Sequence, residues 1–140
     1  MKIGGKVYLR GMKFITKEEF YKLPEGVLYS KWQPQIFDEL YIKGSTLYDG
    51  ATPIDFIDFD LIGNVENKGS DDLFELLYNA EQDLGKPLQE KISLPMDFET
   101  GGRDGLFDDD QLFAVYERKD IEGFISALQR SLAVHIEHNF

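Results

Sequence analysis

The sequence contains no cysteine, and among its 140 residues there are only two histidines, one tryptophan and five prolines. Without cysteine the chain forms no disulfide framework, thiolate zinc site, iron–sulfur cluster or cysteine nucleophile. This composition suits a reducing compartment, so we expect a cytoplasmic protein. The start of the chain does not resemble a signal peptide, and no run of about 18 apolar residues predicts a membrane span.

Positive charge is scarce over most of the chain. The net charge is −11, from 15 Lys and Arg against 26 Asp and Glu. Residues 1–31 hold seven basic and three acidic side chains, whereas residues 32–140 hold eight basic and 23 acidic ones. A surface of this sign repels nucleic-acid phosphates and attracts basic proteins. We therefore expect a basic protein partner and no nucleic acid, although an acidic surface also serves solubility alone.

Length and patterning predict one folded domain over residues 1–140. The chain has the size of a typical domain, and 42% of its residues are hydrophobic. Segments rich in aromatic and β-branched residues predict strands at 6–10, 27–33, 37–43, 46–48, 54–62 and 112–116, with a turn at Gly44. The apolar pattern slips by one residue near Phe56, which predicts either a β-bulge or a strand buried at different faces along its length. The 112–116 run is continuously apolar, which is typical of a strand covered on both faces.

Three segments with apolar residues at helical spacing predict helices at 16–23, 70–84 and 120–136. Thr16, Ser70 and Asp120 are the expected caps, and Glu19 completes a capping box with Thr16. We predict an α+β domain: a mostly antiparallel sheet of about five or six strands, with the three helices packed largely on one face.

An Asp-rich loop is the most unusual local feature. Asp104, Asp108, Asp109 and Asp110 lie within seven positions and offer the oxygen ligands that Ca²⁺ or Mg²⁺ requires. Their spacing does not match an EF-hand, and a solvated turn is the simpler interpretation. A divalent-metal hydrolase using loop 104–110 is therefore kept as an alternative function, with the metal unknown.

Other candidate chemistry is sparse. Asp58 and Asp60 share one face of a predicted strand, where they form either a carboxylate pair of the kind that glycosidases use or the polar face of a half-exposed strand. His135 and His138 lie three residues apart near the end of a predicted helix, as zinc ligands or as structural residues. No nucleophile elbow or phosphate-binding glycine loop is present. We assign no catalytic residue and no cofactor, and favour a binding protein over an enzyme.

Aromatic and acidic residues together suggest a protein interface. Trp32 precedes Asp38 and Glu39, and aromatic anchors within an acidic rim suit a partner rich in Lys and Arg. In size and composition the chain resembles immunity and inhibitor proteins, which implies that it neutralises a basic partner such as a toxin or nuclease. A structural subunit of a phage or secretion assembly is a further alternative, and the oligomeric state is open. The predicted partner-binding residues are Trp32, Asp38, Glu39, Asp58, Asp60, Asp104, Asp108, Asp109 and Asp110.

Overall fold

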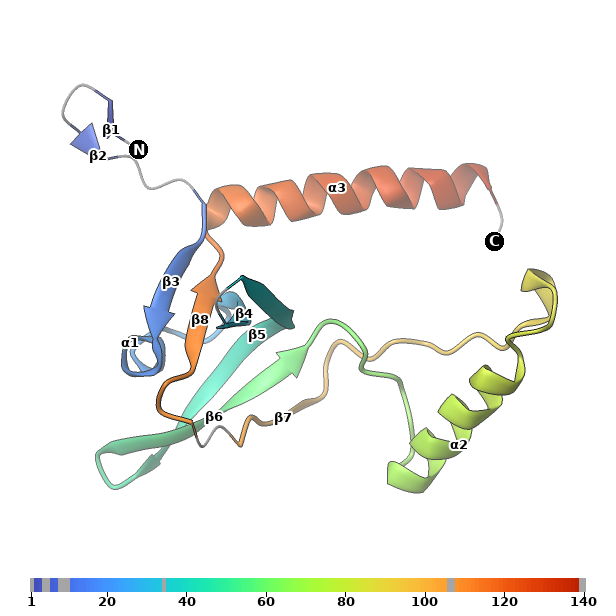
Figure 1. Cartoon of the computed structure of the whole chain (residues 1–140), viewed down its shortest axis with the longest axis horizontal. Helices are drawn as coiled ribbons and strands as arrows, with labels where there is room; N and C mark the ends of the chain where they lie inside the picture. Colours follow the sequence, from blue (N-terminus) through green and yellow to red (C-terminus); the bar gives the residue numbers. More distant parts are fainter. Residues whose placement is uncertain (1, 4–5, 8–10, 34, 106–107, 139–140) are drawn as a thin grey trace.

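The computed structural model describes all residues except 1, 4–5, 8–10, 34, 106–107 and 139–140. Its strands are β1 (Lys2–Ile3), β2 (Lys6–Val7), β3 (Lys13–Thr16), β4 (Leu28–Gln33), β5 (Ile36–Asp49), β6 (Thr52–Asp60), β7 (Gly101–Arg103) and β8 (Leu112–Val115). Its helices are α1 (Lys17–Tyr21), α2 (Ser70–Gln82), α3 (Arg118–Glu137) and the 3₁₀ turn η1 (Leu88–Glu90). Figure 1 shows their arrangement.

Six strands form one antiparallel sheet in the order β3-β8-β4-β5-β6-β7, while β1 and β2 pair separately as a small hairpin. The predicted α+β domain with a mostly antiparallel sheet is confirmed. β8 pairs with β3 on one side and β4 on the other. Its continuous apolar sequence therefore marks an interior strand, as the pattern predicts.

The core lies between the sheet and the short helix α1. Phe20 of α1 is fully buried, and its ring stacks on Phe113 at a centroid distance of 4.1 Å. Tyr29, Tyr41 and Phe56 complete the buried cluster from β4, β5 and β6. The predicted Thr16 capping box is confirmed, since the Glu19 amide donates to Thr16 Oγ1 and the Thr16 amide donates to the Glu19 carboxylate. This cap fixes the helix that delivers Phe20 to the core.

The predicted turn at Gly44 is wrong, because β5 runs without a break from Ile36 to Asp49. A Cβ at Gly44 would lie 3.0 Å from both Cβ and the carbonyl oxygen of Ile57. Glycine here permits a close approach of β6 rather than a reversal of the chain. The pairing of β5 with β6 shifts register between Lys43 and Thr46, which lie opposite residues 56–58. The predicted irregularity near Phe56 is therefore confirmed, and the extra residue belongs to β5.

Two helix starts also differ from prediction. Gly69, rather than Ser70, is the N-cap of α2 and makes no side-chain cap. α3 begins earlier than predicted, at Arg118, and its N-cap is Glu117. Asp120 is the third residue of the helix, and its carboxylate accepts a hydrogen bond from the Glu117 amide. Of the predicted strand 6–10, Lys6 and Val7 are in β2, and residues 8–10 lie outside the described residues.

The helices do not all pack on one face as predicted. α1 lies against β3 and β8, whereas neither α2 nor α3 contains a buried residue. α3 extends from the end of β8 along the top of the view, and α2 lies below it at the lower right, within a long excursion between β6 and β7 (Figure 1). The two apolar helical stripes are present, but the sheet does not cover them.

Candidate functional site

The predicted partner-binding residues differ in how far they are exposed. Asp38, Glu39, Asp108, Asp109 and Asp110 are exposed, whereas Asp58 and Asp60 on β6 are half-buried. The Asp104 side chain is only 1% exposed. Trp32 is half-buried, with its ring 4.4 Å from that of Phe14. Their role in binding a partner stays a prediction, and only the exposed members are accessible to one.

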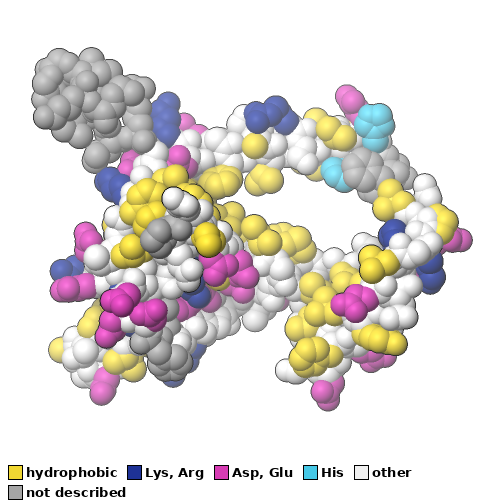
Figure 2. Space-filling view, viewed as in Figure 1, with side chains coloured by type: hydrophobic (Ala, Val, Ile, Leu, Met, Phe, Trp, Pro, Cys, Tyr) yellow, Lys and Arg dark blue, Asp and Glu magenta, His cyan; other side chains and the backbone are white. Residues whose placement is uncertain are grey.

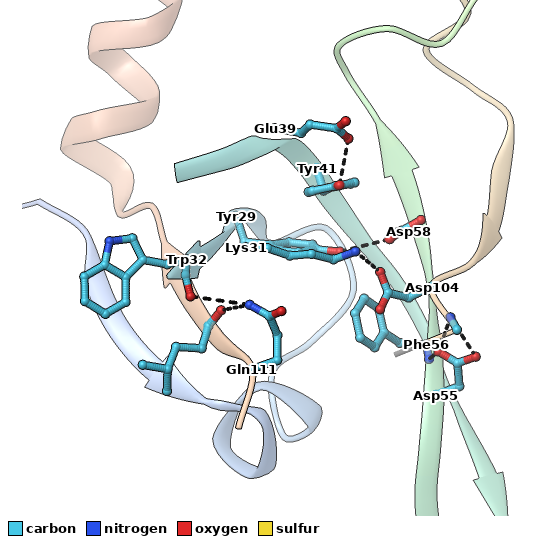
Figure 3. A network of polar contacts seen from close by, with 12 residues as sticks. Tyr29, Lys31, Trp32, Glu39, Tyr41, Asp55, Phe56, Asp58, Asp104 and Gln111 are labelled. Carbon is cyan, nitrogen blue, oxygen red and sulfur yellow. Dashed lines mark hydrogen bonds and ion pairs between the residues drawn. The ribbon is translucent and has the colours of Figure 1, made fainter. Parts of the chain in front are cut away.

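Asp104 belongs to a buried ionic network rather than to a solvated turn (Figure 3). Its Oδ1 lies 2.6 Å from the Lys31 ammonium, which β4 contributes from a distant part of the sequence. The Tyr29 hydroxyl donates to Asp58 Oδ2 at 3.4 Å, and Lys31 Nζ also lies 5.0 Å from the centre of the Tyr41 ring. Burial lowers the pKa of Lys31, but hydrogen bonding and attraction to Asp104 outweigh it and raise the pKa overall.

Asp58 carries the most perturbed carboxyl of this network. Burial raises its pKa to about 7, and the neighbouring Asp104 and Asp60 carboxylates add to the rise, while Lys31 opposes it. Two buried carboxyls side by side favour sharing one proton. Asp58 therefore changes protonation near neutral pH, and its partners are Tyr29, Lys31 and Asp104 of the same network.

A second carboxylate anchors the chain that follows β7. Asp55 is buried and accepts from the Arg103 guanidinium at 3.0 Å and from the Gly105 amide at 3.1 Å. Burial alone would raise its pKa, but the bonds from the Phe56 amide, Arg103 and Gly105 lower it. Asp55 therefore holds both ends of the 103–105 segment, and Lys31 pairs with Asp104 in its middle, which explains why Asp104 is buried.

Two surface hollows adjoin these elements. One of about 260 Å³ lies beside Asp58, Asp60 and Arg103, and its volume falls below the range typical of small-molecule sites. A larger one of about 690 Å³ lies between α1 and the β5–β6 turn, where Tyr48 and Ile54 are exposed. Lys17 at its border pairs with Asp109 at 3.3 Å.

The metal-site hypotheses gain no support from the geometry. Among the residues that the structure describes, no three His, Asp or Glu side chains are grouped so as to hold an ion. His138 is the C-terminal cap of α3, and Asp104 is engaged by Lys31. Asp108, Asp109 and Asp110 are exposed, and Asp108 accepts from the Asp110 amide in a local turn.

The feature that the sequence analysis missed is the arm, residues 61–100, which joins β6 to β7 and carries α2. The outgoing and returning segments of the arm run side by side, and Val65 forms a β-bridge with Met96. The Glu66 amide donates to the Pro95 carbonyl, and the Asp97 amide donates to the Asn64 carbonyl. The amphipathic pattern of α2 was the one signal in the sequence. Such a pattern does not show whether the apolar side of a helix packs against its own chain or is left exposed.

Comparison with protein-family models, with curated proteins and with solved structures gives no match. None of the helices in the described part of the chain combines the length and apolar character needed to cross a membrane. The function must therefore be argued from the geometry of this molecule.

Proposed function

We propose that this chain is a protein-binding module that engages a basic protein through the exposed side of α2. The observation that carries the proposal is the exposure of large apolar side chains on a well-formed helix. Phe74 is 70% exposed, Tyr78 61% and Leu77 41%. These three residues lie on the same side of α2, as their helical spacing requires. An aromatic and aliphatic patch of this kind is typical of an interaction site.

The charges of α2 indicate the kind of partner. The helix carries four acidic residues and no basic one. Glu81 lies one turn beyond Leu77 and Tyr78, so a carboxylate borders the apolar patch. A complementary surface therefore has an apolar groove with Lys or Arg at its rim, in the manner of helix-in-groove recognition. The net charge of −11 favours the same class of partner.

The arm holds α2 in place for binding. Lys91 Nζ donates to the carbonyls of Asp83 and Leu84 at 2.8 and 3.1 Å, and so satisfies the C-terminal end of the helix. The Asp83 carboxylate accepts from the Ile92 amide at 2.6 Å and pairs with Lys86 at 2.9 Å. A helix that is already ordered loses less conformational entropy on binding, which favours affinity.

An inhibitor or immunity-type protein that neutralises a cytoplasmic toxin or nuclease is the most specific form of this proposal. It is supported by the acidic composition, by the small size and by an interaction surface that is separate from the buried ionic network. In such a protein, charge complementarity accelerates association, while Phe74, Leu77 and Tyr78 supply the apolar anchors.

The proposal is tested by selecting ligands from a displayed library of random peptides with the wild-type chain as bait. A Phe74→Glu/Leu77→Glu variant serves as the counter-selection bait, and Asn79→Glu, on the opposite side of α2, is the matched charge control. We expect the wild type and Asn79→Glu to enrich peptides that combine apolar residues with Lys or Arg, and their affinity to fall as salt rises. Equal enrichment by the Phe74→Glu/Leu77→Glu variant, or enrichment of neutral peptides with salt-independent affinity, would overturn the proposal.

A further inference from the structure

The apolar side of α3 has the spacing of a helix-pairing seam. Ile121, Ile125, Leu128, Leu132 and His135 follow one another at intervals of four, three, four and three residues. This 3.5-residue average is the repeat by which two helices pack along their length. Leu128 is 66% exposed and Leu132 60%, so the seam is uncovered in the isolated chain. Figure 2 shows hydrophobic side chains, in yellow, along both α2 and α3 at the molecular surface.

The total surface area shows that the chain is more open than a compact monomer of its mass. The chain exposes 10494 Å². A compact monomer of this mass exposes about 7,400 Å², so the excess is about 3,000 Å². A standard interface buries about 800 Å² on each partner. The excess is therefore large enough for the α2 site and for a second, independent interface on α3.

The charge of α3 favours a second copy of this chain as its partner. The helix carries three basic and three acidic residues, so it is neutral in a chain of net charge −11. A second copy of α3 can approach it without net repulsion. α2, with four acidic residues and no basic one, would repel its own copy. A strongly basic partner, in turn, would gain little attraction from a neutral helix.

We propose that α3 is a self-association surface, on which α3 of a second copy packs antiparallel about a two-fold axis near Leu128. In this arrangement Ile121 and His135 of one copy lie opposite His135 and Ile121 of the other. The helix is about 30 Å long, so antiparallel pairing places the two acidic sheets at opposite ends of the helix pair. A parallel pair would bring them side by side and increase their repulsion. This inference stands independently of the proposed binding role of α2.

The test is the mass of the full chain in solution, measured by sedimentation equilibrium from nanomolar to high micromolar concentration. We expect the wild type to reach the mass of two chains. Leu128→Glu, which places two carboxylates at the axis, should remain at the mass of one chain, and so should Leu132→Glu. Neither residue is buried in the monomer, so the circular dichroism of both variants should stay that of a folded chain.

Two matched controls make the test specific. Ala133→Glu adds the same charge to α3 outside the seam, and Phe74→Glu adds it to α2; both should still dimerise. A monomeric wild type at every concentration, dimers of Leu128→Glu as stable as those of Ala133→Glu, or loss of the dimer in Phe74→Glu would each overturn the inference. A monomeric wild type that still selected basic peptides through α2 would leave the proposed function intact.

The direction of pairing is tested by oxidative crosslinking, because the chain has no cysteine of its own. Leu128→Cys should crosslink to its copy near the axis. Ile121→Cys should not, because the antiparallel arrangement separates the two positions by about 20 Å, well beyond disulfide reach. Crosslinking of Ile121→Cys as fast as Leu128→Cys would contradict the antiparallel arrangement.

Discussion

Replacement of Lys31 by methionine is the sharpest test of the buried ionic network. Methionine keeps most of the volume of the side chain but removes the ammonium group, which lies 2.6 Å from Asp104 Oδ1. The Asp104 side chain is 1% exposed, so water cannot replace the lost partner without rearrangement. Breaking a buried pair in this way costs about 3 to 5 kcal/mol.

The cost has an upper limit, because an unpaired buried carboxylate takes up a proton. Protonation of an ordinary aspartate costs about 4 kcal/mol at about pH 7 and about 1.5 kcal/mol at about pH 5. Loss of Lys31 removes the cation that lowers the pKa of Asp58, so the native pKa of that carboxyl, already above its unfolded value, rises further. The destabilisation is therefore fully present above the raised pKa and declines as the pH falls toward the unfolded pKa. We expect a loss of about 3 to 4 kcal/mol near pH 7, or about 10 °C in Tm, and less than half of that near pH 5.

The assay is urea unfolding of the wild type and of Lys31→Met at both pH values. Lys13→Met is the matched control, because the Lys13 side chain is 52% exposed and its 3.6 Å pair with Glu117 is a surface pair. Its loss should not exceed about 1 kcal/mol. A loss below about 1 kcal/mol for Lys31→Met near pH 7, or an equal loss at both pH values, would refute the reasoning.

Three further predictions concern stability. Asp58→Asn should stabilise the fold near pH 8 and stabilise it less near pH 5, because the raised pKa of about 7 means that the wild type loses native stability as the pH rises from the unfolded pKa of the carboxyl to that value; an equal or larger gain near pH 5 would contradict this. Gly44→Ala should destabilise by about 1 to 3 kcal/mol in urea unfolding, since the new Cβ would lie 3.0 Å from Ile57, and an unchanged midpoint would count against that close approach. Gly123→Ala, where no atom lies within 4 Å of the new Cβ, should stabilise α3 by about 0.5 to 1 kcal/mol, visible as a higher thermal midpoint, and a lower midpoint would argue against the helix.

Local signals in the sequence predicted much of the fold. The Thr16 and Glu19 box depends on residues three apart, and the interior position of β8 follows from its continuous apolar run. Such features are encoded within a few residues, so they can be read without knowledge of the tertiary structure. β7 was missed because Gly101–Arg103 has no strand propensity of its own and pairs only because β6 lies beside it.

The candidate sites depended on contacts that sequence patterns do not contain. Asp104 lies in a Gly- and Asp-rich segment that is typical of a solvated loop, and only the position of Lys31 on β4 accounts for its burial. The apolar stripes of α2 and α3 predicted both helices correctly. The sequence pattern of such a stripe is the same whether the helix packs on its own sheet or on another molecule. For this reason the helices were expected on one face of the sheet.

The most direct test of the proposed binding role is amide hydrogen exchange of α2 in the free chain and with a peptide selected by the wild type. In the free chain, the amides of residues 70–82 should exchange faster than those of β8, because α2 has no buried residue. The peptide should slow exchange in α2 more than anywhere else. Exchange of α2 as slow as that of β8 in the free chain, or protection by the peptide only outside the arm, would contradict the proposal.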